Sequence, residues 1–348
     1  MKLHWLLAAA LLAPSGCAPL PRPATEAPAT LTMPNMPLHD PWIVADKASG
    51  TYYLYTKNEQ RMTGDPRIGT MVYTSRNLRD WTAPKLVFTL PEGIWANEGA
   101  WAPNVHRYRG RYYLFTTLHN EGATLPPGAT KRPTHRRGTV AAVADRPEGP
   151  FTLINGGEPI APASLMTLDG SLWSENGRNW MIYAHEWIQV ADGRMEAVPL
   201  DRDLKASGPP ITLFKASDAG WAAGQKQPEG DTVYVTDGPE LMRTRTGQLL
   251  MLWSSWGSDG YVQSIARSAT GKLEGPWVQL LPLVRGDSGH GMIFNSFDGK
   301  MLLVMHRPFN NARGKIYEVE DRGDRLHIVR QRRDLDGDPP EAERFIVR

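Results

Sequence analysis

The sequence has only one cysteine, Cys17, so a disulfide within the chain is excluded. Beyond the first twenty residues it also lacks any apolar run near the roughly 20 residues that a membrane-spanning helix needs. Neither charge dominates, because 39 Lys and Arg stand against 37 Asp and Glu, for a formal net charge of +2. A nucleic-acid partner needs a clustered basic surface, so none is expected. We interpret the short basic runs at residues 131–137 and 330–333 as solvated surface.

Extended helical periodicity is scarce too, whereas turn formers and aromatic residues are abundant. The chain contains 33 Gly, 29 Pro, 12 Trp and 11 Tyr. Gly and Pro that repeatedly interrupt short aromatic and β-branched runs are typical of turn-rich, all-β proteins. The aromatics also suit sugar binding, since the C–H faces of a sugar ring pack on an aromatic plane, although β cores use aromatic residues equally.

Three parts follow one another along the chain. Residues 1–17 are predicted to be a secretory signal peptide, with Lys2 as its positive start and an apolar stretch at residues 5–13. The end of this segment resembles a lipoprotein cleavage site, and Cys17 either carries a lipid that attaches the protein to a membrane or is removed with the leader. Residues 18–37, rich in Pro, Ala and Thr, are predicted to be a linker. We expect an exported protein, periplasmic or secreted, whose folded domain spans residues 38–348.

A fivefold repeat organises this domain. Each unit opens with a residue next to Pro or Gly, runs through a short strand to a turn that ends in Gly, and continues in an apolar, often aromatic strand. The units open at Asp40, Ala102, Asp169, Asp237 and His290. Units of about 50 to 70 residues with about four strands each are typical of propeller blades. The pattern predicts an all-β, five-bladed β-propeller, with an immunoglobulin-like array as the weaker alternative.

The predicted fold brings distant acidic residues together. In a propeller the first strand of each blade lines the central channel, so Asp40, Asp169 and Asp237 should meet near one end of it. A single Asp before Pro or Gly is usually a turn residue, but three at equivalent blade positions favour a function. Hydrolysis of a glycosidic bond needs one carboxylic acid and one carboxylate, and such a channel can supply both.

The opening segments of the blades resemble those of glycoside hydrolase family 43. The resemblance is carried by residues 38–43 with 52–56, 101–106, 236–239 with 250–255, and 289–294. It implies an inverting hydrolase that acts on arabinose- or xylose-containing glycans. By this resemblance Asp40 is the general base, and Asp169 is a third acid that positions the general acid and tunes its pKa. His290 would lie near the channel axis, where the family often holds a water-ligated cation, commonly Ca²⁺; the alternative is a histidine that hydrogen-bonds within the channel. No cofactor is expected to be required.

Two departures from the family pattern affect these roles. The general acid is usually a Glu before Gly-Pro, whereas this chain has the shorter Asp237. Glu186 is an alternative proton donor, and the choice between the two stays open. Glu240 is a further candidate, although strand parity would turn it away from the channel. The second departure is Asn104, where many relatives carry an acid.

The expected partner is an oligo- or polysaccharide, bound by a protein that acts as a monomer. Trp42, Trp101 and Trp187 are candidate sugar platforms, although most tryptophans of a propeller fill the space between blades. His290 is a further candidate contact, and Arg307 is predicted either to hydrogen-bond a sugar hydroxyl or to form a surface salt bridge. Two rival functions are a non-catalytic carbohydrate-binding propeller and a retaining, fructan-type glycosidase; carboxylates about 5 Å apart would favour retention, and about 6.5 to 9.5 Å would favour inversion.

Overall fold

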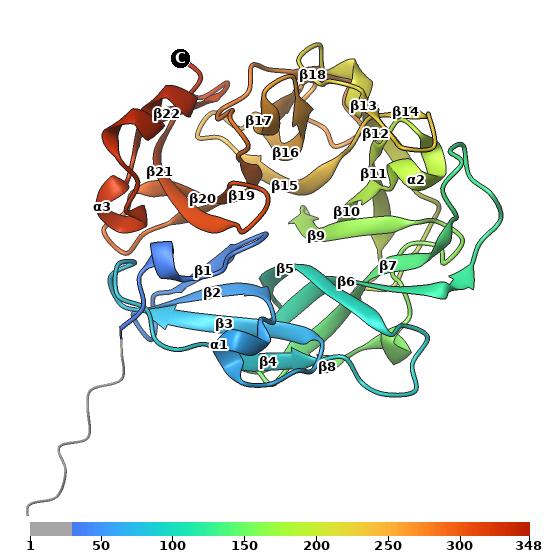
Figure 1. Cartoon of the computed structure of the whole chain (residues 1–348), viewed down its shortest axis with the longest axis horizontal. Helices are drawn as coiled ribbons and strands as arrows, with labels where there is room; N and C mark the ends of the chain where they lie inside the picture. Colours follow the sequence, from blue (N-terminus) through green and yellow to red (C-terminus); the bar gives the residue numbers. More distant parts are fainter. Residues whose placement is uncertain (1–29) are drawn as a thin grey trace, which may run out of the picture.

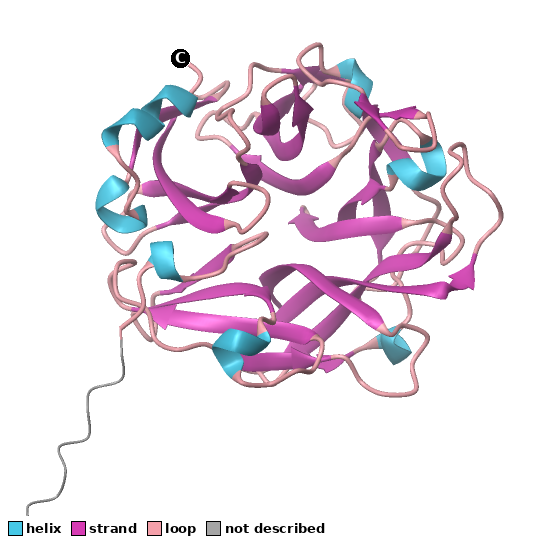
Figure 2. Ribbon diagram, in the orientation of Figure 1, coloured by secondary structure: helices cyan, strands magenta, loops and turns pink. Residues whose placement is uncertain are grey.

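The computed structural model describes residues 30–348, which form five four-stranded antiparallel sheets around a central axis (Figure 1). Strands dominate, and the helices are short pieces at the periphery of the ring (Figure 2). The predicted five-bladed β-propeller is therefore confirmed. The predicted signal peptide, Cys17 and the first part of the predicted linker lie outside the described residues. Within residues 30–348 no helix is long and apolar enough to cross a membrane.

Each blade is built from consecutive strands. The first contains β1 (Trp42–Asp46), β2 (Thr51–Lys57), β3 (Gly69–Ser75) and β4 (Lys85–Thr89), and the second contains β5 (Glu98–Tyr108), β6 (Arg111–Thr124), β7 (His135–Ala144) and β8 (Thr152–Leu153). The third contains β9 (Thr167–Glu175), β10 (Arg178–His185), β11 (Arg194–Leu200) and β12 (Ile211–Lys215). The fourth contains β15 (Asp237–Arg243), β16 (Leu249–Gly257), β17 (Gly260–Ser268) and β18 (Trp277–Gln279), and the fifth contains β19 (Gly289–Asn295), β20 (Met301–Arg307), β21 (Arg313–Asp321) and β22 (Leu326–Gln331).

The remaining elements connect or flank the blades. A small hairpin of β13 (Gln225–Lys226) and β14 (Thr232–Val233) precedes the fourth blade. The α-helices are α1 (Gln60–Thr63), α2 (Trp187–Val190) and α3 (Arg333–Asp336). The 3₁₀ helices are η1 (Met33–Asn35), η2 (Asn155–Gly157), η3 (Ala216–Asp218) and η4 (Pro340–Phe345).

A glycine in the left-handed region ends the first turn of every blade, as the repeat predicts. These turns join the first strand to the second, and φ is +61° to +84° at Gly50, Gly110, Gly177, Gly247 and Gly299. Most residues avoid this region because their Cβ collides with the backbone, whereas glycine has no Cβ. The five glycines therefore set the hairpins that fix which strand of each blade faces the channel.

The core fills the space between blades. Every residue of β16 except Trp256 is buried, and β20 is buried from Leu302 to Arg307. Such second strands are covered on both faces by neighbouring blades, so they read as near-continuous apolar runs. Trp253, for example, is fully buried and packs against Phe214 of the preceding blade, with ring centroids 5.2 Å apart.

The ring closes between the first and last blades without exchanging a strand. The segment before β1 bridges them instead: Leu31 pairs with Trp81, and the Leu38 amide donates to the Ala312 carbonyl at 3.1 Å. Met33 and Met36 have no exposed surface. Residues 31–37 thus belong to the folded domain, which begins seven residues before the predicted boundary at residue 38. Burial of the two methionines, which the Pro-rich composition concealed, explains the difference.

Candidate active site

A pocket of about 560 Å³ lies at one end of the channel and is lined by residues from all five blades. The four carboxyl groups predicted to carry catalysis all line it: Asp40, Asp169, Glu186 and Asp237. Their sequence separation shows that the blade arrangement, and no local motif, brings them together.

In every blade one residue in, or just before, the first strand has a backbone in the left-handed region. The residues are Asp40 (φ +50°), Ala102 (+47°), Asp169 (+56°), Gly238 (+55°) and His290 (+51°). This region is strained for residues other than glycine, and such strain is concentrated at functional sites.

Asp237 does not occupy the same blade position as Asp40 and Asp169, which corrects the sequence prediction. In the fourth blade Gly238 takes the left-handed position, and Asp237 precedes it. The strand register agrees, because Asp237 pairs with the second strand just as Trp101 does in the second blade, immediately before a bulge. The one-residue difference sends the Asp237 carboxyl toward Tyr261 of β17.

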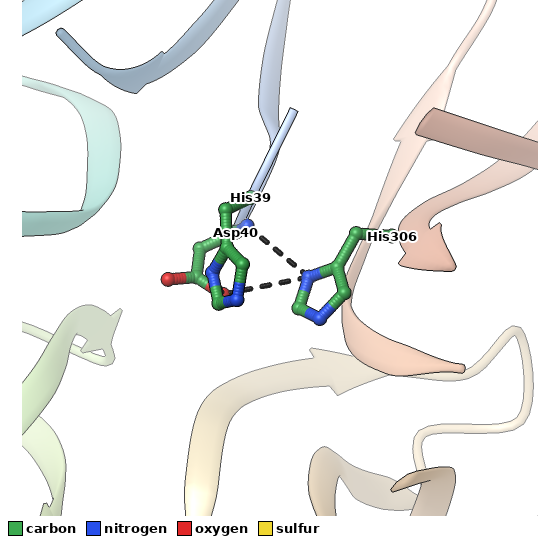
Figure 3. A group of neighbouring side chains, drawn as sticks. All are labelled: His39, Asp40 and His306. Atoms are coloured by element: carbon green, nitrogen blue, oxygen red, sulfur yellow. Dashed lines mark hydrogen bonds and ion pairs between the residues drawn. The ribbon is translucent and has the colours of Figure 1, made fainter. Parts of the chain in front are cut away.

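Histidines surround Asp40 (Figure 3). One carboxylate oxygen, Oδ1, lies 2.9 Å from His39 Nδ1 and 3.0 Å from His290 Nδ1. The Asp40 amide donates to His306 Nδ1 at 3.2 Å. Burial alone would favour the neutral acid, but the positive charges of His290 and His39 outweigh it and hold the pKa of Asp40 well below its usual range. Asp40 is thus kept as a carboxylate.

His306, on β20, holds the backbone of Asp40 in place. Its ring is fully buried and stacks on His39, with centroids 4.2 Å apart. Burial lowers the pKa of His306 well below its ordinary value, so the ring is neutral and its Nδ1 is free to accept the Asp40 amide. The ligand atoms of His39, Asp40 and His306 lie close enough to hold a metal ion. However, His306 Nδ1 is already engaged by the backbone.

Asp169 lies deeper, at the base of the pocket, and is 4% exposed. Its Oδ2 accepts the Gly238 amide at 3.1 Å and lies 3.8 Å from His290 Nδ1, and its own amide donates to Thr117 Oγ1 at 2.9 Å. Burial and the negative charge of Asp40 together raise the pKa of Asp169 well above its usual range. The fixed backbone contacts make Asp169 a rigid neighbour for the other acids.

Asp237 is held by a tyrosine. Tyr261 Oη donates to Asp237 Oδ2 at 2.9 Å. Burial, followed by the charge of Asp169, raises the pKa of Asp237 well above its usual range. Asp237 therefore differs from Asp40 in the property that separates a proton donor from a proton acceptor.

Glu186, the N-cap of α2, is 6% exposed and forms an ion pair with the guanidinium of Arg137. Arg137 also lies 3.1 Å from His135 Nε2 and 5.3 Å from the ring centroid of Trp101. The predicted solvated surface at residues 131–137 is thus wrong for Arg137, which is 8% exposed. The guanidinium occupies one oxygen of the Glu186 carboxyl group, Oε2, which commits this side chain to Arg137.

A second group of potential ligands, His119, Glu121 and His135, lies behind this ion pair. The guanidinium of Arg137, 3.1 Å from His135 Nε2, opposes a cation there. In contrast, a small cavity of about 10 Å³ on the channel axis is bordered by Asn104, Glu240 and His290. Strand parity was expected to turn Glu240 away from the channel, but Glu240 borders this axial cavity and is absent only from the catalytic pocket. Its Oε2 accepts the Ile293 amide at 2.8 Å.

The predicted sugar contacts divide into two groups. Trp101, Trp187 and His290 line the pocket. Trp42 and Arg307 do not, which corrects their assignment as sugar contacts; for Arg307 the structure shows the predicted alternative, a salt bridge. The Trp42 indole donates to the Val105 carbonyl at 2.9 Å and fills the space between two blades. Arg307 is 7% exposed and forms an ion pair with Asp338 of the C-terminal segment, which satisfies its charge inside the protein.

Several lining residues were not anticipated from the sequence. They come from second and third strands and from a loop, namely Lys57, Arg137, Trp256, Tyr261 and Phe309. Tyr261 could have been noticed as an aromatic residue directly after the turn glycine Gly260. The others carry no sequence signal of their own, because their position depends on how the blades meet.

The chain matches known proteins along nearly the whole domain. Residues 34–334 match the family described as Glycosyl hydrolases family 43. The structure is similar to that of an endo-arabinase from Bacteroides thetaiotaomicron VPI-5482, with a TM-score of 0.74, 35% identity, and coverage of 84% of this chain and 97% of that chain. An endo-1,4-beta-xylanase from the same organism, 20% identical with a TM-score of 0.65 over 87% of this chain and 97% of that chain, shares the fold.

A curated relative was also found in Bacillus subtilis (strain 168). Its extracellular endo-alpha-(1->5)-L-arabinanase 1 is 27% identical over 153 residues, which are 41% of this chain and 44% of the relative. The match therefore spans less than half the length of that relative.

Proposed function

The chain belongs to glycosyl hydrolases family 43 and is a glycoside hydrolase acting on O-glycosyl bonds. We propose that it hydrolyses arabinose- or xylose-containing glycans with inversion of configuration. Among these glycans, we propose arabinan as the preferred substrate. The observation that carries the mechanism is that two carboxyl groups of one pocket have opposite neighbours. Asp40 Oδ1 lies 2.9 and 3.0 Å from the Nδ1 atoms of His39 and His290, whereas Asp237 is buried near Asp169 and accepts the Tyr261 hydroxyl at 2.9 Å. These neighbours lower the pKa of Asp40 and leave that of Asp237 raised. Acid and base roles follow from such a separation. Two relatives support arabinan as the substrate: the endo-arabinase from Bacteroides thetaiotaomicron, which is 35% identical, and the arabinanase from Bacillus subtilis, which is 27% identical over the matched part.

In the proposed reaction Asp40 is the general base. Its carboxylate takes a proton from a water molecule, whose oxygen forms a bond to the anomeric carbon on the face opposite the leaving group. The bond from that carbon to the leaving oxygen breaks, and the proton donor protonates this oxygen. The product sugar has the inverted configuration. His39 and His290 support this role because they hold Asp40 ionised and fix its orientation.

Asp237 is the proposed general acid, in preference to Glu186. Its raised pKa keeps a proton available, and the hydroxyl of Tyr261 holds its orientation. Glu186 is instead committed to Arg137, and we propose that this ion pair positions Trp101 and shapes the sugar subsite. Asp169 tunes the acid: its proximity disfavours a negative charge on Asp237, as the resemblance implied.

We further propose that the small axial cavity takes a hard cation such as Ca²⁺ or an ordered water. The oxygen donors of Asn104 and Glu240 suit Ca²⁺ in their chemistry, and His290 borders the same cavity. A bound cation would add positive charge below the carboxyl groups. Thermal unfolding with Ca²⁺ and with a chelator, in wild type and in Glu240→Gln, tests the site. If neither addition changes the unfolding midpoint of either protein, no cation binds there.

Export is part of the proposal. It is supported by the signal-like residues 1–17 and by the extracellular relative from Bacillus subtilis. Mass spectrometry of the mature N-terminus tests it, since a diacylglyceryl group on Cys17 would establish lipid anchoring, and cleavage after residue 17 would establish release.

The catalytic proposal is tested by hydrolysis of arabinan, arabinoxylan and xylan with wild type and Asp40→Asn, and by proton NMR of the first anomer released. An inverted anomer and a loss of activity in Asp40→Asn are expected. Retention of configuration would support the fructan-type rival. Binding of these glycans that is unaffected by Asp40→Asn, without hydrolysis by wild type, would support the non-catalytic rival.

A further inference from the structure

A second cavity lies at the other end of the third and fourth blades. Asp169 and Asp237 stand at the beginning of β9 and β15, where the catalytic pocket opens, whereas Glu175 and Arg243 are the last residues of the same strands. Glu175 lies six positions after Asp169 along β9, which is about 20 Å of extended strand. The cavity at this far end has a volume of about 720 Å³, which is within the usual range for a ligand site.

Two tryptophans form one wall of this cavity. Trp173 and Trp180 are directly opposed partners on β9 and β10, so their side chains stand on the same face of the blade. Both are half-buried: one part of each ring packs against the core between the third and fourth blades, and both rings also line the cavity. Tryptophans that only fill space between blades, such as Trp253, have no exposed surface.

The remaining wall is polar and rigid. Arg243 donates from Nε and Nη2 to the two carboxylate oxygens of Glu175, both at 2.6 Å, and from Nη1 to the carbonyls of Gly247 and Gly271 at 2.9 and 2.8 Å. The exposed side chains of Arg178 and Lys272 supply donors at the rim. Acceptors are supplied there by an exposed amide and an exposed carboxylate, those of Asn176 and Glu274.

These features together describe a sugar site. A flat aromatic wall packs against the C–H face of a sugar ring, and sugar hydroxyls need donors and acceptors side by side, which the rim provides. Three basic and two acidic residues line the cavity, and two of the five are paired with each other. The near balance of charge suits a neutral glycan and gives no basis for a polyanion.

We propose that this cavity, which we call the Trp173–Trp180 site, binds the pentose-containing polysaccharide at a distance from the catalytic pocket. The proposal rests on the proposed substrate class but not on the catalytic mechanism. A second contact with the same polymer raises the effective concentration of chain at the catalytic pocket without a new catalytic group. It therefore promotes attack on long or insoluble chains and leaves short oligosaccharides unaffected.

The test uses native gel electrophoresis in gels that contain soluble arabinan, arabinoxylan or xylan. All proteins carry Asp40→Asn, so the polymer stays intact. Adding Trp173→Ala and Trp180→Ala should weaken the affinity for the polymer, measured from the retardation, about tenfold. This is the equivalent of about 1.4 kcal/mol. Leu281→Ala, which removes an apolar side chain 72% exposed elsewhere on the surface, is the matched control and should change nothing.

A second pair of variants keeps the test independent of folding. Arg178→Ala and Lys272→Ala alter only exposed rim side chains and should weaken polymer retardation about threefold, without a shift of the thermal midpoint. In catalytically intact protein the tryptophan variants should hydrolyse an oligosaccharide of three or four sugars within twofold of wild type, yet degrade polymer more slowly.

The outcomes separate the two proposals. Unchanged retardation in both sets of variants overturns the Trp173–Trp180 site and leaves these tryptophans as packing residues. Equal losses on oligosaccharide and polymer overturn it too, because they indicate a distorted propeller. If wild type hydrolyses none of the glycans but retardation still depends on the tryptophans, the proposed function fails and the binding site stands.

Discussion

Two corners of one pocket hold aspartates with opposite properties. At the junction of the first and fifth blades, Asp40 contacts His39 and His290, and their positive charges hold its pKa well below the usual range. On the fourth blade, Asp237 faces Tyr261 and a neighbouring acid, and burial raises its pKa well above that range. Both residues are aspartates, so their different neighbours decide which one acts as the base and which one as the acid.

The largest expected effect comes from removing the base. Asp40→Asn keeps the shape of the side chain but cannot accept a proton from water. We expect kcat on arabino-oligosaccharides to fall about 10³-fold, within the range for a general base, with KM little changed. Steady-state kinetics measures both values. A loss of less than tenfold would show that Asp40 is not the base.

Replacing the acid should give an effect that depends on the leaving group. Asp237→Asn should lower kcat/KM about 10²- to 10³-fold on natural glycans, but much less on an aryl glycoside whose leaving group needs little protonation. Glu186→Gln serves as the comparison and should affect both substrate types equally, because it breaks the ion pair with Arg137. The reverse pattern would assign the proton donor to Glu186.

Removing a histidine that contacts Asp40 should raise the pKa of Asp40 and so bring it closer to that of Asp237. His290→Gln removes the positive charge that does most to lower the pKa of Asp40, so that pKa should rise. The acidic limb of the pH profile of kcat/KM then moves to higher pH, and activity near pH 5 falls about tenfold more than activity near pH 7. His327→Gln, on β22 far from the pocket, is the matched control. An acidic limb that stays in place would separate His290 from the ionisation of Asp40.

The smallest expected effect is on stability. Because the pKa of Asp237 is raised on folding, the folded protein holds this proton more tightly than the unfolded chain. Stability is therefore lost as the pH rises above the pKa of an ordinary Asp, about 3.9. Asp237→Asn removes this dependence, so its thermal midpoint should exceed that of wild type by a few degrees near pH 8 and approach it near pH 5. A midpoint difference that does not grow with pH would contradict the raised pKa.

The fold could be predicted because its signals are local. Turn glycines such as Gly177 and Gly247 lie at fixed places in each repeat, and the aromatic strands follow them. The position of Asp40 and Asp169 at the start of first strands could be predicted for the same reason. The family resemblance, now confirmed by the match over residues 34–334, agrees with both.

The parts that could not be predicted depend on contacts between blades. Whether Asp237 or Gly238 takes the left-handed position depends on the register of β15 against β16, which no short motif encodes. The sequence left Arg307 between a sugar contact and a surface salt bridge; it pairs with Asp338, 31 residues later, and its side chain in that pair is buried. His306 carries no motif, and its role exists only because the fifth blade closes against the first.

Direct titration of the two aspartates tests the central claim. Carbon-13 NMR of protein labelled at the aspartate carboxyl carbons follows each group, with Asp40→Asn and Asp237→Asn providing the assignments. We predict that the Asp40 resonance titrates below the range of an ordinary aspartate and that the Asp237 resonance titrates well above that range. An Asp237 that loses its proton at a lower pH than Asp40 would contradict the assignment of base and acid.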